Sequence, residues 1–153
     1  MAKGNKTILA LYGAANTGKT ATLSKLIDLY KDLQKDMKEV RVEELPGFRW
    51  GDRGAVVHYK GKTIGIFTGG DSRDILEDAM NKLGENRDLY VCASHIKGQT
   101  ADYLKKEKKV ICWLRKADAD SDPKQGDHEK TLHAFINNQQ ANNMLEMIEK
   151  ILF

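Results

Sequence analysis

Apolar and polar positions follow two periods along the chain, one typical of strands and one typical of helices. Short apolar runs bounded by glycine or charged residues predict buried strands. Two of these runs, AVVHY and TIGIF, flank KGK at 60–62, which predicts an antiparallel hairpin at 55–67 with Gly61 in its turn. The predicted strands are 7–12, 40–45, 55–59, 63–67, 89–93 and 109–114.

Apolar residues spaced three and four positions apart predict helices between these strands. The second helix is expected to begin at a cap formed by Asp71 or Ser72 and to end at Gly84. A short helix is expected at 100–108, and a helical tail from Asp127 with an interruption near 137–140. The apolar faces are Leu23, Leu26, Ile27, Tyr30, Leu33 and Met37 in the first helix, Ile75, Leu76, Ala79, Met80 and Leu83 in the second, and Leu145, Ile148 and Leu152 in the tail.

Helical and strand-like segments alternate from one end of the chain to the other. The sequence has no internal repeat, no low-complexity tract and no break in composition, so residues 1–153 are expected to form a single domain. Alternating strands and helices are typical of the α/β class. The expected architecture is a mostly parallel sheet with helices on both faces, combined with the hairpin at 55–67.

Composition and charge narrow the classes of partner. Hydrophobic residues make up 41% and charged residues 31% of the 153 positions, which is typical of a globular domain and leaves no stretch of roughly 20 apolar residues for a membrane span. The start, MAKGNK, precedes no apolar signal region. We therefore expect a cytoplasmic protein without a membrane partner, with Cys92 and Cys112 as buried thiols. The net charge of +3 is spread out, with its densest run, KKEKK, at 105–109, so a nucleic-acid partner is disfavoured although left open.

The stretch GAANTGKT, at 13–20, carries the clearest chemical signal. It lies between the predicted strand 7–12 and the first predicted helix, which is the context that a phosphate-binding loop requires. Gly13 and Gly18 allow backbone torsions that turn successive N–H groups toward phosphate oxygens, and the helix adds the positive end of its dipole. Lys19 is expected to reach the β- and γ-phosphates, and the Thr20 hydroxyl to bind Mg²⁺.

Through Gly13, Gly18, Lys19 and Thr20 the chain resembles the P-loop NTPase superfamily. The resemblance is specific to this loop and extends to the remaining chain only as an order of elements. It implies a P-loop NTPase-like α/β fold, ATP or GTP as ligand, with ATP preferred, and a magnesium ion. The nucleotide-binding residues that it implies are Gly13, Ala14, Ala15, Asn16, Thr17, Gly18, Lys19, Thr20 and Ala21.

A second acidic site is expected to support the metal. Asp71 is the first candidate, because TIGIFTGGD is an apolar strand followed by a glycine turn, and Gly69 and Gly70 let the backbone pass near the γ-phosphate. The alternative makes Asp71 only the cap of the following helix. Glu43 and Glu44 are the next candidates, as bases for a substrate hydroxyl or simply as exposed side chains.

Small GTPases share part of this pattern. They place a hairpin after the first helix and follow it with D-x-x-G, where this chain has FTGG with Phe67 in place of the aspartate. Their N-K-x-D motif corresponds to RKAD, which keeps Lys116 and Asp118 but has Arg115 in place of asparagine. A branch whose loop carries a second lysine directly after the first glycine fits less well, because Ala14 stands at that position.

Two other segments are candidates for substrate contact. The loop 46–54 contains Phe48, Arg49, Trp50 and Arg53, which suit stacking on a substrate or stabilising a transferring phosphate, or equally a plain surface loop. At the strand ends, His95, Lys97 and Arg115 are candidate substrate contacts, with Ser94 and Thr100 beside them, because ligands gather at the carboxyl ends of parallel strands. A capped turn with Thr100 as N-cap is the alternative.

Two apparent metal motifs are rejected. Acidic residues in 118–129 fall at calcium-loop positions, but Pro123 stands where a positive φ is required, so a mobile acidic loop or lid is expected. His128 and His133 lie about 140° apart around a helix and cannot share one zinc ion. The acidic positions are Asp118, Asp120, Asp122 and Glu129.

The sequence leaves three functions open. An ATPase would activate water and signal to a partner protein, whereas a kinase would transfer the γ-phosphate to a small-molecule acceptor. In both, Lys19 and Asp71 are the catalytic candidates, Thr20 and Asp71 the metal ligands. The third is a nucleotide-binding interaction module with little turnover.

Overall fold

A mixed sheet with helices on both faces forms the body of the protein. The computed structural model describes residues 6–14, 17–48, 51–70, 72–95, 98–107, 109–117 and 126–153. The strands are β1 (Thr7–Tyr12), β2 (Val40–Leu45), β3 (Gly54–Tyr59), β4 (Lys62–Phe67), β5 (Leu89–Ser94) and β6 (Lys109–Arg115). The helices are α1 (Lys19–Asp36), α2 (Arg73–Leu83), α3 (Gln99–Glu107) and α4 (Gly126–Leu152).

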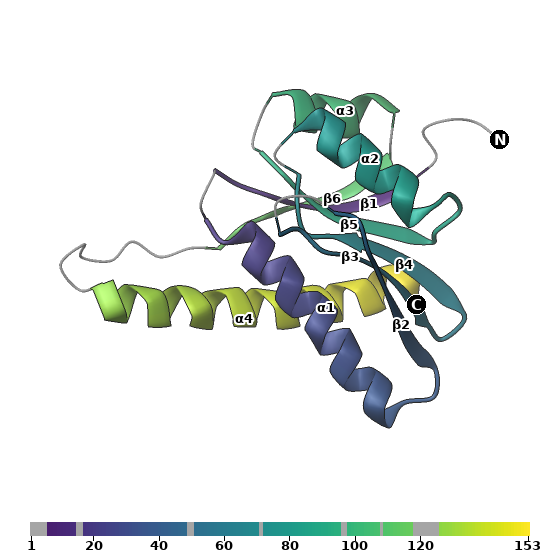
Figure 1. The fold of residues 1–153 in the computed structure, drawn as a ribbon, viewed down its shortest axis with the longest axis horizontal. Helices are drawn as coiled ribbons and strands as arrows, with labels where there is room; N and C mark the ends of the chain where they lie inside the picture. Colours follow the sequence, from purple (N-terminus) through teal and green to yellow (C-terminus); the bar gives the residue numbers. More distant parts are fainter. Residues whose placement is uncertain are drawn as a thin grey trace.

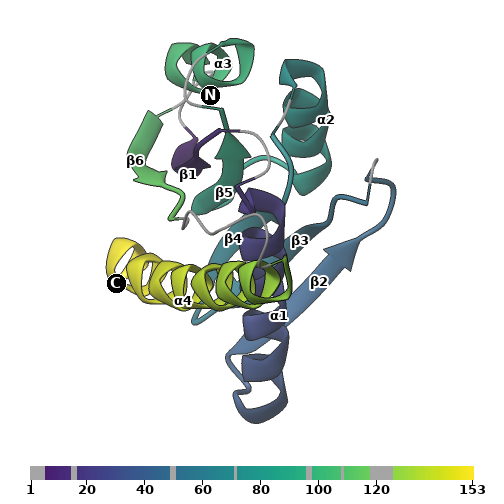
Figure 2. The same ribbon diagram turned by 90° about the vertical axis from the view of Figure 1, so that its left-hand side faces the viewer.

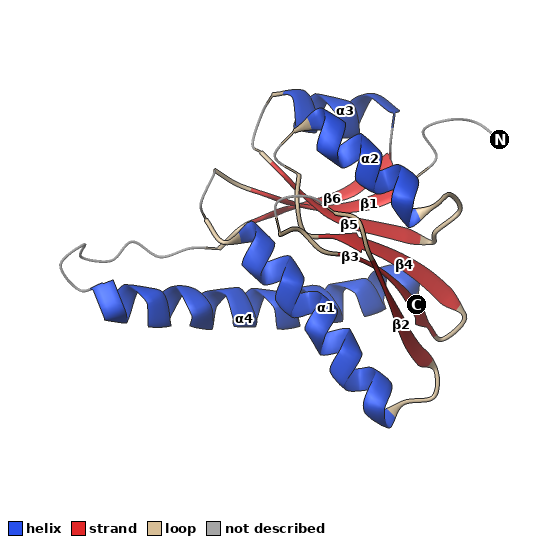
Figure 3. Ribbon diagram, viewed as in Figure 1, coloured by secondary structure: helices blue, strands red, loops and turns tan. Residues whose placement is uncertain are grey.

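The strand order of the sheet is β2-β3-β4-β5-β1-β6 (Figure 3). Strands β4, β5, β1 and β6 pair in parallel, while β2 and β4 flank β3 in antiparallel pairs. The α/β class and the hairpin at 55–67 are therefore confirmed. Because β1 lies between β5 and β6, the segment that leaves β1 emerges among the carboxyl ends of four parallel strands.

Two helical layers cover the sheet, as predicted. Helices α2 and α3 lie on one face, and α1 and α4 lie on the other, with α4 crossing α1 (Figures 1 and 2). The alternation along β1 shows why both faces are apolar. Leu9 and Leu11 pack with residues of α1 and α4, whereas Ile8 and Ala10 pack with residues of α2 and α3. All four of these β1 side chains are fully buried.

The predicted hairpin turn and the predicted ends of α2 are also confirmed. Lys60 and Gly61 both have positive φ, 48° and 82°, as a two-residue hairpin turn matching the strand twist requires. The Ser72 hydroxyl caps α2 by accepting a hydrogen bond from the N–H of Ile75 at 3.2 Å, and Gly84 ends the helix. Asp71 lies outside the described residues.

Three details of the prediction are wrong. Helix α4 runs without interruption through 137–140, where the side chains of Asn137 and Gln140 bind α1 and the segment after β6 instead of competing for their own backbone. Thr100 lies inside α3, one residue after its start, and is not the N-cap. Cys92 is buried, and burial raises its thiol pKa to about 12, but Cys112 is partly exposed, since β6 is an edge strand.

None of the described helices combines the length and the hydropathy needed to cross a bilayer.

Gly70→Ala is expected to lower the free energy of unfolding by about 2–3 kcal/mol, because a Cβ at this position would overlap the main-chain carbonyl of Ala93. Gly61→Ala is the control: its surroundings are open, so only the positive φ is penalised, by about 1 kcal/mol. Chemical denaturation measures both. Equal losses in the two variants would contradict close packing of the β4–α2 loop against β5.

Candidate phosphate-binding site

The loop between β1 and α1 lies where the carboxyl ends of three strands meet. The N–H of Gly13 donates to the carbonyl of Ser94, at the end of β5, at 3.2 Å. On the other side the N–H of Lys116, just after β6, donates to the carbonyl of Tyr12 at 2.8 Å. The loop therefore begins between β5 and β6, the position at which open α/β sheets bind ligands. Ala15 and Asn16 lie outside the described residues.

Gly18 turns the loop into α1. It has φ 92° and occupies the N-cap position, which favours glycine because a side chain is strained at that torsion. Gly18 supplies no capping side chain, and the first turn of α1 contains no acidic residue. The positive end of the α1 dipole is therefore not neutralised within the helix, and an anion bound there would be stabilised.

Lys19 places its ammonium inside the loop. Its Nζ donates to the carbonyl of Gly13 at 2.7 Å and to that of Ala14 at 3.1 Å, and the residue is only 6% exposed. The Thr17 hydroxyl also donates to the Ala14 carbonyl, at 2.8 Å. These carbonyls hold the ammonium beside the helix N-terminus. A phosphate entering the loop would compete with them for the same ammonium.

Thr20 and Ala21 are exposed in the first turn of α1, at the mouth of the loop. The Thr20 hydroxyl is a hard oxygen of the kind that Mg²⁺ prefers, so it can supply one ligand to such an ion. No cluster of three or more His, Cys, Asp or Glu side chains suited to a metal occurs among the residues that the structure describes. The other predicted ligand, Asp71, lies outside them.

A carboxylate that the sequence analysis did not consider lies at the end of β4. Asp52 Oδ1 is 3.4 Å from the hydroxyl of Thr68, and a Cβ built on Gly69 would collide with the Asp52 carboxylate. The carbonyl of Gly69 accepts a hydrogen bond from the N–H of Ala93, on β5. Because β5 lies between β4 and β1, Gly69 is two strand spacings, roughly 10 Å, from the loop between β1 and α1. The hairpin register indicates this position: Gly54 pairs with Phe67, which sets Asp52 opposite Gly69.

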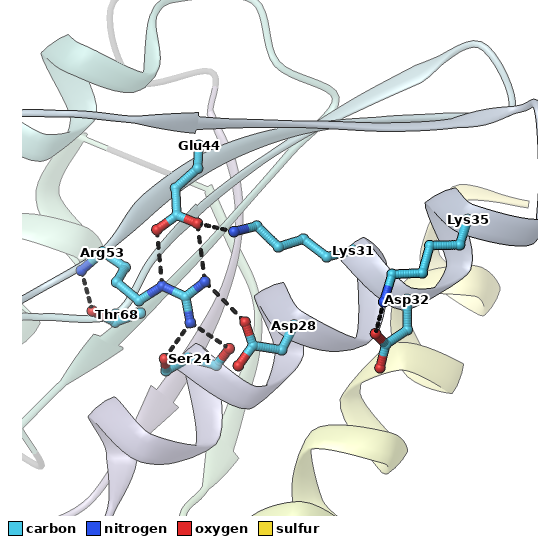
Figure 4. Close-up of polar contacts among 8 residues, drawn as sticks. All are labelled: Ser24, Asp28, Lys31, Asp32, Lys35, Glu44, Arg53 and Thr68. Carbon is cyan, nitrogen blue, oxygen red and sulfur yellow. Dashed lines mark hydrogen bonds and ion pairs between the residues drawn. The ribbon is translucent and has the colours of Figure 1, made fainter.

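Arg53 joins three segments through one guanidinium (Figure 4). Its Nε and Nη2 donate to the two carboxylate oxygens of Glu44, on β2, at 2.9 and 3.0 Å. Nη2 also donates to Asp28 at 2.9 Å, and Nη1 donates to the hydroxyl of Ser24 at 2.6 Å. Lys31 forms a further ion pair with Glu44. Ser24 and Asp28 follow Thr20 at four-residue intervals, so this cluster lies on the face of α1 that begins at Thr20.

These contacts affect whether Glu44 can act as the base that takes a proton from a substrate hydroxyl. The hydrogen bonds from Arg53 and then from Lys31 lower the pKa of Glu44 to about 2. A carboxylate with so low a pKa is a weak base, which disfavours Glu44 in that role. Glu43 is exposed, with its carboxylate 3.8 Å from Arg41. The guanidinium of Arg53 is occupied by hydrogen bonds to the carboxylates of Glu44 and Asp28 in this arrangement.

The loop 46–54 contributes packing as well. The Phe48 ring lies 5.4 Å from the Phe67 ring and occupies the space beside Gly54. Phe48 therefore anchors the loop to the sheet. Arg49 and Trp50 lie outside the described residues.

The ends of β5 and β6 bring some of the predicted substrate residues to the loop. Ser94 is buried, and its hydroxyl donates to the carbonyl of His95 at 2.9 Å, while the N–H of His95 donates to Thr100 Oγ1 at 3.4 Å. His95 therefore lies one residue from the partner of Gly13. Arg115 is exposed at the end of β6. Lys97, Asp118 and the remaining acidic positions up to Asp122 lie outside the described residues.

Helix α4 supplies two contacts that the sequence analysis missed. Asn137 Oδ1 lies 3.3 Å from the Thr22 hydroxyl and 2.6 Å from a Cβ built on Gly18. Gln140 accepts from the N–H of Ala117 and donates to the carbonyl of Arg115, both at 2.8 Å. No local pattern marks these residues, because their partners lie far away in the sequence.

In comparisons with known proteins, no protein-family model, no curated protein and no solved structure matches the chain.

Glu44→Gln is expected to destabilise the protein by about 1 kcal/mol at pH 7, since the ion pairs of a partly exposed cluster are weakened. The folded-state pKa of Glu44, about 2, lies below its ordinary value of 4.5. The stabilisation by the carboxylate is therefore complete above pH 4.5 and is lost as the pH falls toward 2. Urea denaturation across this range should show the wild type and the variant converging.

Glu43→Gln is the matched control, because its exposed carboxylate makes only a long contact with Arg41. It should change stability by less than about 0.5 kcal/mol at each pH. A gap between wild type and Glu44→Gln that stays constant down to pH 2.5 would contradict the assignment.

Proposed function

We propose that this chain is a Mg²⁺-dependent nucleoside-triphosphate-binding protein of the P-loop type that hydrolyses ATP or transfers its γ-phosphate. The phosphate site in this proposal is Gly13–Thr20, extended by Ala21. The acceptor is water or the hydroxyl of a small molecule, and a partner protein would read the nucleotide state in the hydrolytic version.

One observation carries the proposal. The buried ammonium of Lys19 lies inside a loop at the carboxyl ends of β1, β5 and β6, next to a helix N-terminus that has no acidic residue in its first turn. A fixed cation and the positive end of a dipole converge there. This combination suits a ligand with several negative charges, and it is the context in which G-x-x-x-x-G-K-T binds a triphosphate.

Each residue then has a separate role. Lys19 would exchange its carbonyl partners for β- and γ-phosphate oxygens and so hold the transferring group. The main-chain N–H groups at the start of α1 would bind the remaining oxygens, and Thr20 with Asp71 would hold the magnesium ion. The bound ion would neutralise charge that develops on the phosphates. His95, Lys97 and Arg115 are the candidate contacts on the substrate side.

GTP is the alternative nucleotide. Lys116 of the RKAD stretch lies beside the loop, with its Cβ 3.2 Å from a Cβ built on Gly13. The closeness of Lys116 to the loop supports the hypothesis that a guanine base would lie near the end of β6. A binding module with little turnover is supported by a different observation, since Glu44 and Arg53 are committed to one another.

Lys19→Ala is expected to abolish stabilisation by Mg²⁺-ATP and Mg²⁺-GTP. At a ligand concentration of about 100 times Kd, the wild type should gain about 2.7 kcal/mol, whereas the variant should gain none. Lys25→Ala, on the same helix, is the control and should respond like the wild type. Thermal-shift titration measures both, and a Lys19→Ala variant that still gains stability would show that the ligand binds elsewhere.

Phosphate release from γ-labelled ATP separates the three versions. Release without an added acceptor supports the ATPase, and release or transfer that needs an acceptor supports the kinase. Tight binding without either supports the module. Absence of binding in the wild type would overturn the whole proposal.

The acidic ligand can be located by comparing Asp71→Asn with Asp52→Asn. If Asp71 supports the metal, its variant should raise the Mg²⁺ concentration for half-maximal nucleotide binding about tenfold or more, while Asp52→Asn leaves it unchanged. The reverse result would assign the role to Asp52, beside Gly69. Unchanged magnesium dependence in both variants would contradict an acidic ligand at the end of β4.

A further inference from the structure

One stripe of side chains on helix α4 contacts Gly18, at the end of the loop between β1 and α1, and the backbone just after β6, which lies beside the start of that loop. Ala141, Met144 and Ile148 are fully buried in the core that α1 shares with the sheet. One turn earlier the same stripe becomes polar, as Gln140 and then Asn137. The polar positions therefore lie where α4 leaves the core and reaches the carboxyl edge of the sheet.

Gln140 secures the start of the loop indirectly. Because the N–H of Lys116 points to Tyr12 of β1, the neighbouring carbonyl of Arg115 and N–H of Ala117 point to the free edge of β6. The Gln140 amide binds both of these groups and is itself buried, with 7% exposure. The side-chain amide of Gln140 thus makes the two hydrogen bonds that the backbone of a neighbouring strand would make at this edge. These bonds hold the backbone on both sides of Lys116, whose side chain lies against Gly13.

Asn137 secures the end of the loop. Its amide lies against Gly18, with Oδ1, Nδ2 and Cγ 2.6, 2.9 and 3.1 Å from a Cβ built there. Thr22, in the first turns of α1, is fully buried and places its hydroxyl between the Gly18 carbonyl, at 2.9 Å, and Asn137 Oδ1. Any residue larger than glycine at position 18 would displace Asn137. The amide thus borders the turn at which the loop becomes helix.

We propose that Asn137 is a positioning residue of the phosphate site and, with Gln140, couples the docking of α4 to occupation of the loop. This inference rests on the proposed function. Asn137 keeps Gly18 and the first turn of α1 in the conformation that receives phosphate, and Gln140 does the same at Gly13. Because such coupling is reciprocal, a bound phosphate chain also tightens α4 against α1 and β6.

Asn137→Asp separates this role from a merely structural one. The substitution keeps an acceptor oxygen and the shape of the side chain but adds a negative charge beside the α1 N-terminus. Without ligand the charge is favourable there, so the melting temperature should stay equal or rise. Affinity for Mg²⁺-ATP, Mg²⁺-GTP and inorganic tripolyphosphate should fall about tenfold at low salt and less at high salt.

Asn143→Asp is the matched control, with the same charge change on an exposed position of the same helix. It should bind all three probes as the wild type does. Calorimetric titration measures the affinities. If Asn137→Asp also binds like the wild type, or loses affinity for nucleotides but not for tripolyphosphate, the inference is overturned while nucleotide binding stands. If the wild type binds none of the probes, the proposed function and the inference both fail.

Hydrogen exchange tests the coupling with a second variant. In the wild type, saturating Mg²⁺-ATP or Mg²⁺-GTP should slow exchange of backbone amides in 131–141 several-fold. In Asn137→Ala, measured at saturation, this added protection should largely disappear while the protection of α1 remains. Equal added protection in both proteins, or none in the wild type when it binds, would overturn the coupling.

Discussion

A buried ammonium needs hydrogen-bond acceptors, and those of Lys19 include the main-chain carbonyls of Gly13 and Ala14. Both residues directly follow β1, which lies inside the sheet and ends between β5 and β6. The α1 N-terminus adds a second positive feature that nothing in its own first turn offsets. The arrangement places an ammonium and the positive end of a helix dipole side by side, and an anion bound there would be stabilised by both.

Arg53, Glu44 and Asp28 form a second charged cluster, farther along α1. Arg53 makes paired hydrogen bonds to Glu44 and a further bond to Asp28, and it ties β2 and the start of β3 to α1. This cluster fixes the face of α1 that begins at Thr20. Charges that are paired in this way position the helix, and the Arg53 guanidinium is occupied by Glu44, Asp28 and Ser24.

Sequence periodicity predicted most of the fold because the central strands and the first two helices have clear apolar patterns. Residues 13–20 were identified as a loop between a strand and a helix because the motif is local. The prediction of a break near 137–140 was wrong, since polar residues in a helix suggest a break only when they lack distant partners. Asn137 and Gln140 have such partners, in α1 and beyond the end of β6. The ion pairs of Arg53 were not predicted for the same reason, because they depend on which strands are neighbours in the sheet.

The change of chemistry along α4 explains how one helix serves both the core and the site. Met144 and Ile148 are held by apolar burial, which tolerates small shifts because dispersion and hydrophobic contacts have little directionality. Gln140 and Asn137 are held by hydrogen bonds, which weaken steeply with misalignment. A shift of the loop ends by less than an ångström is therefore resisted mainly by the polar half of the stripe. Under the proposed coupling, such a helix would respond to the geometry of the loop while its attachment to the core persists.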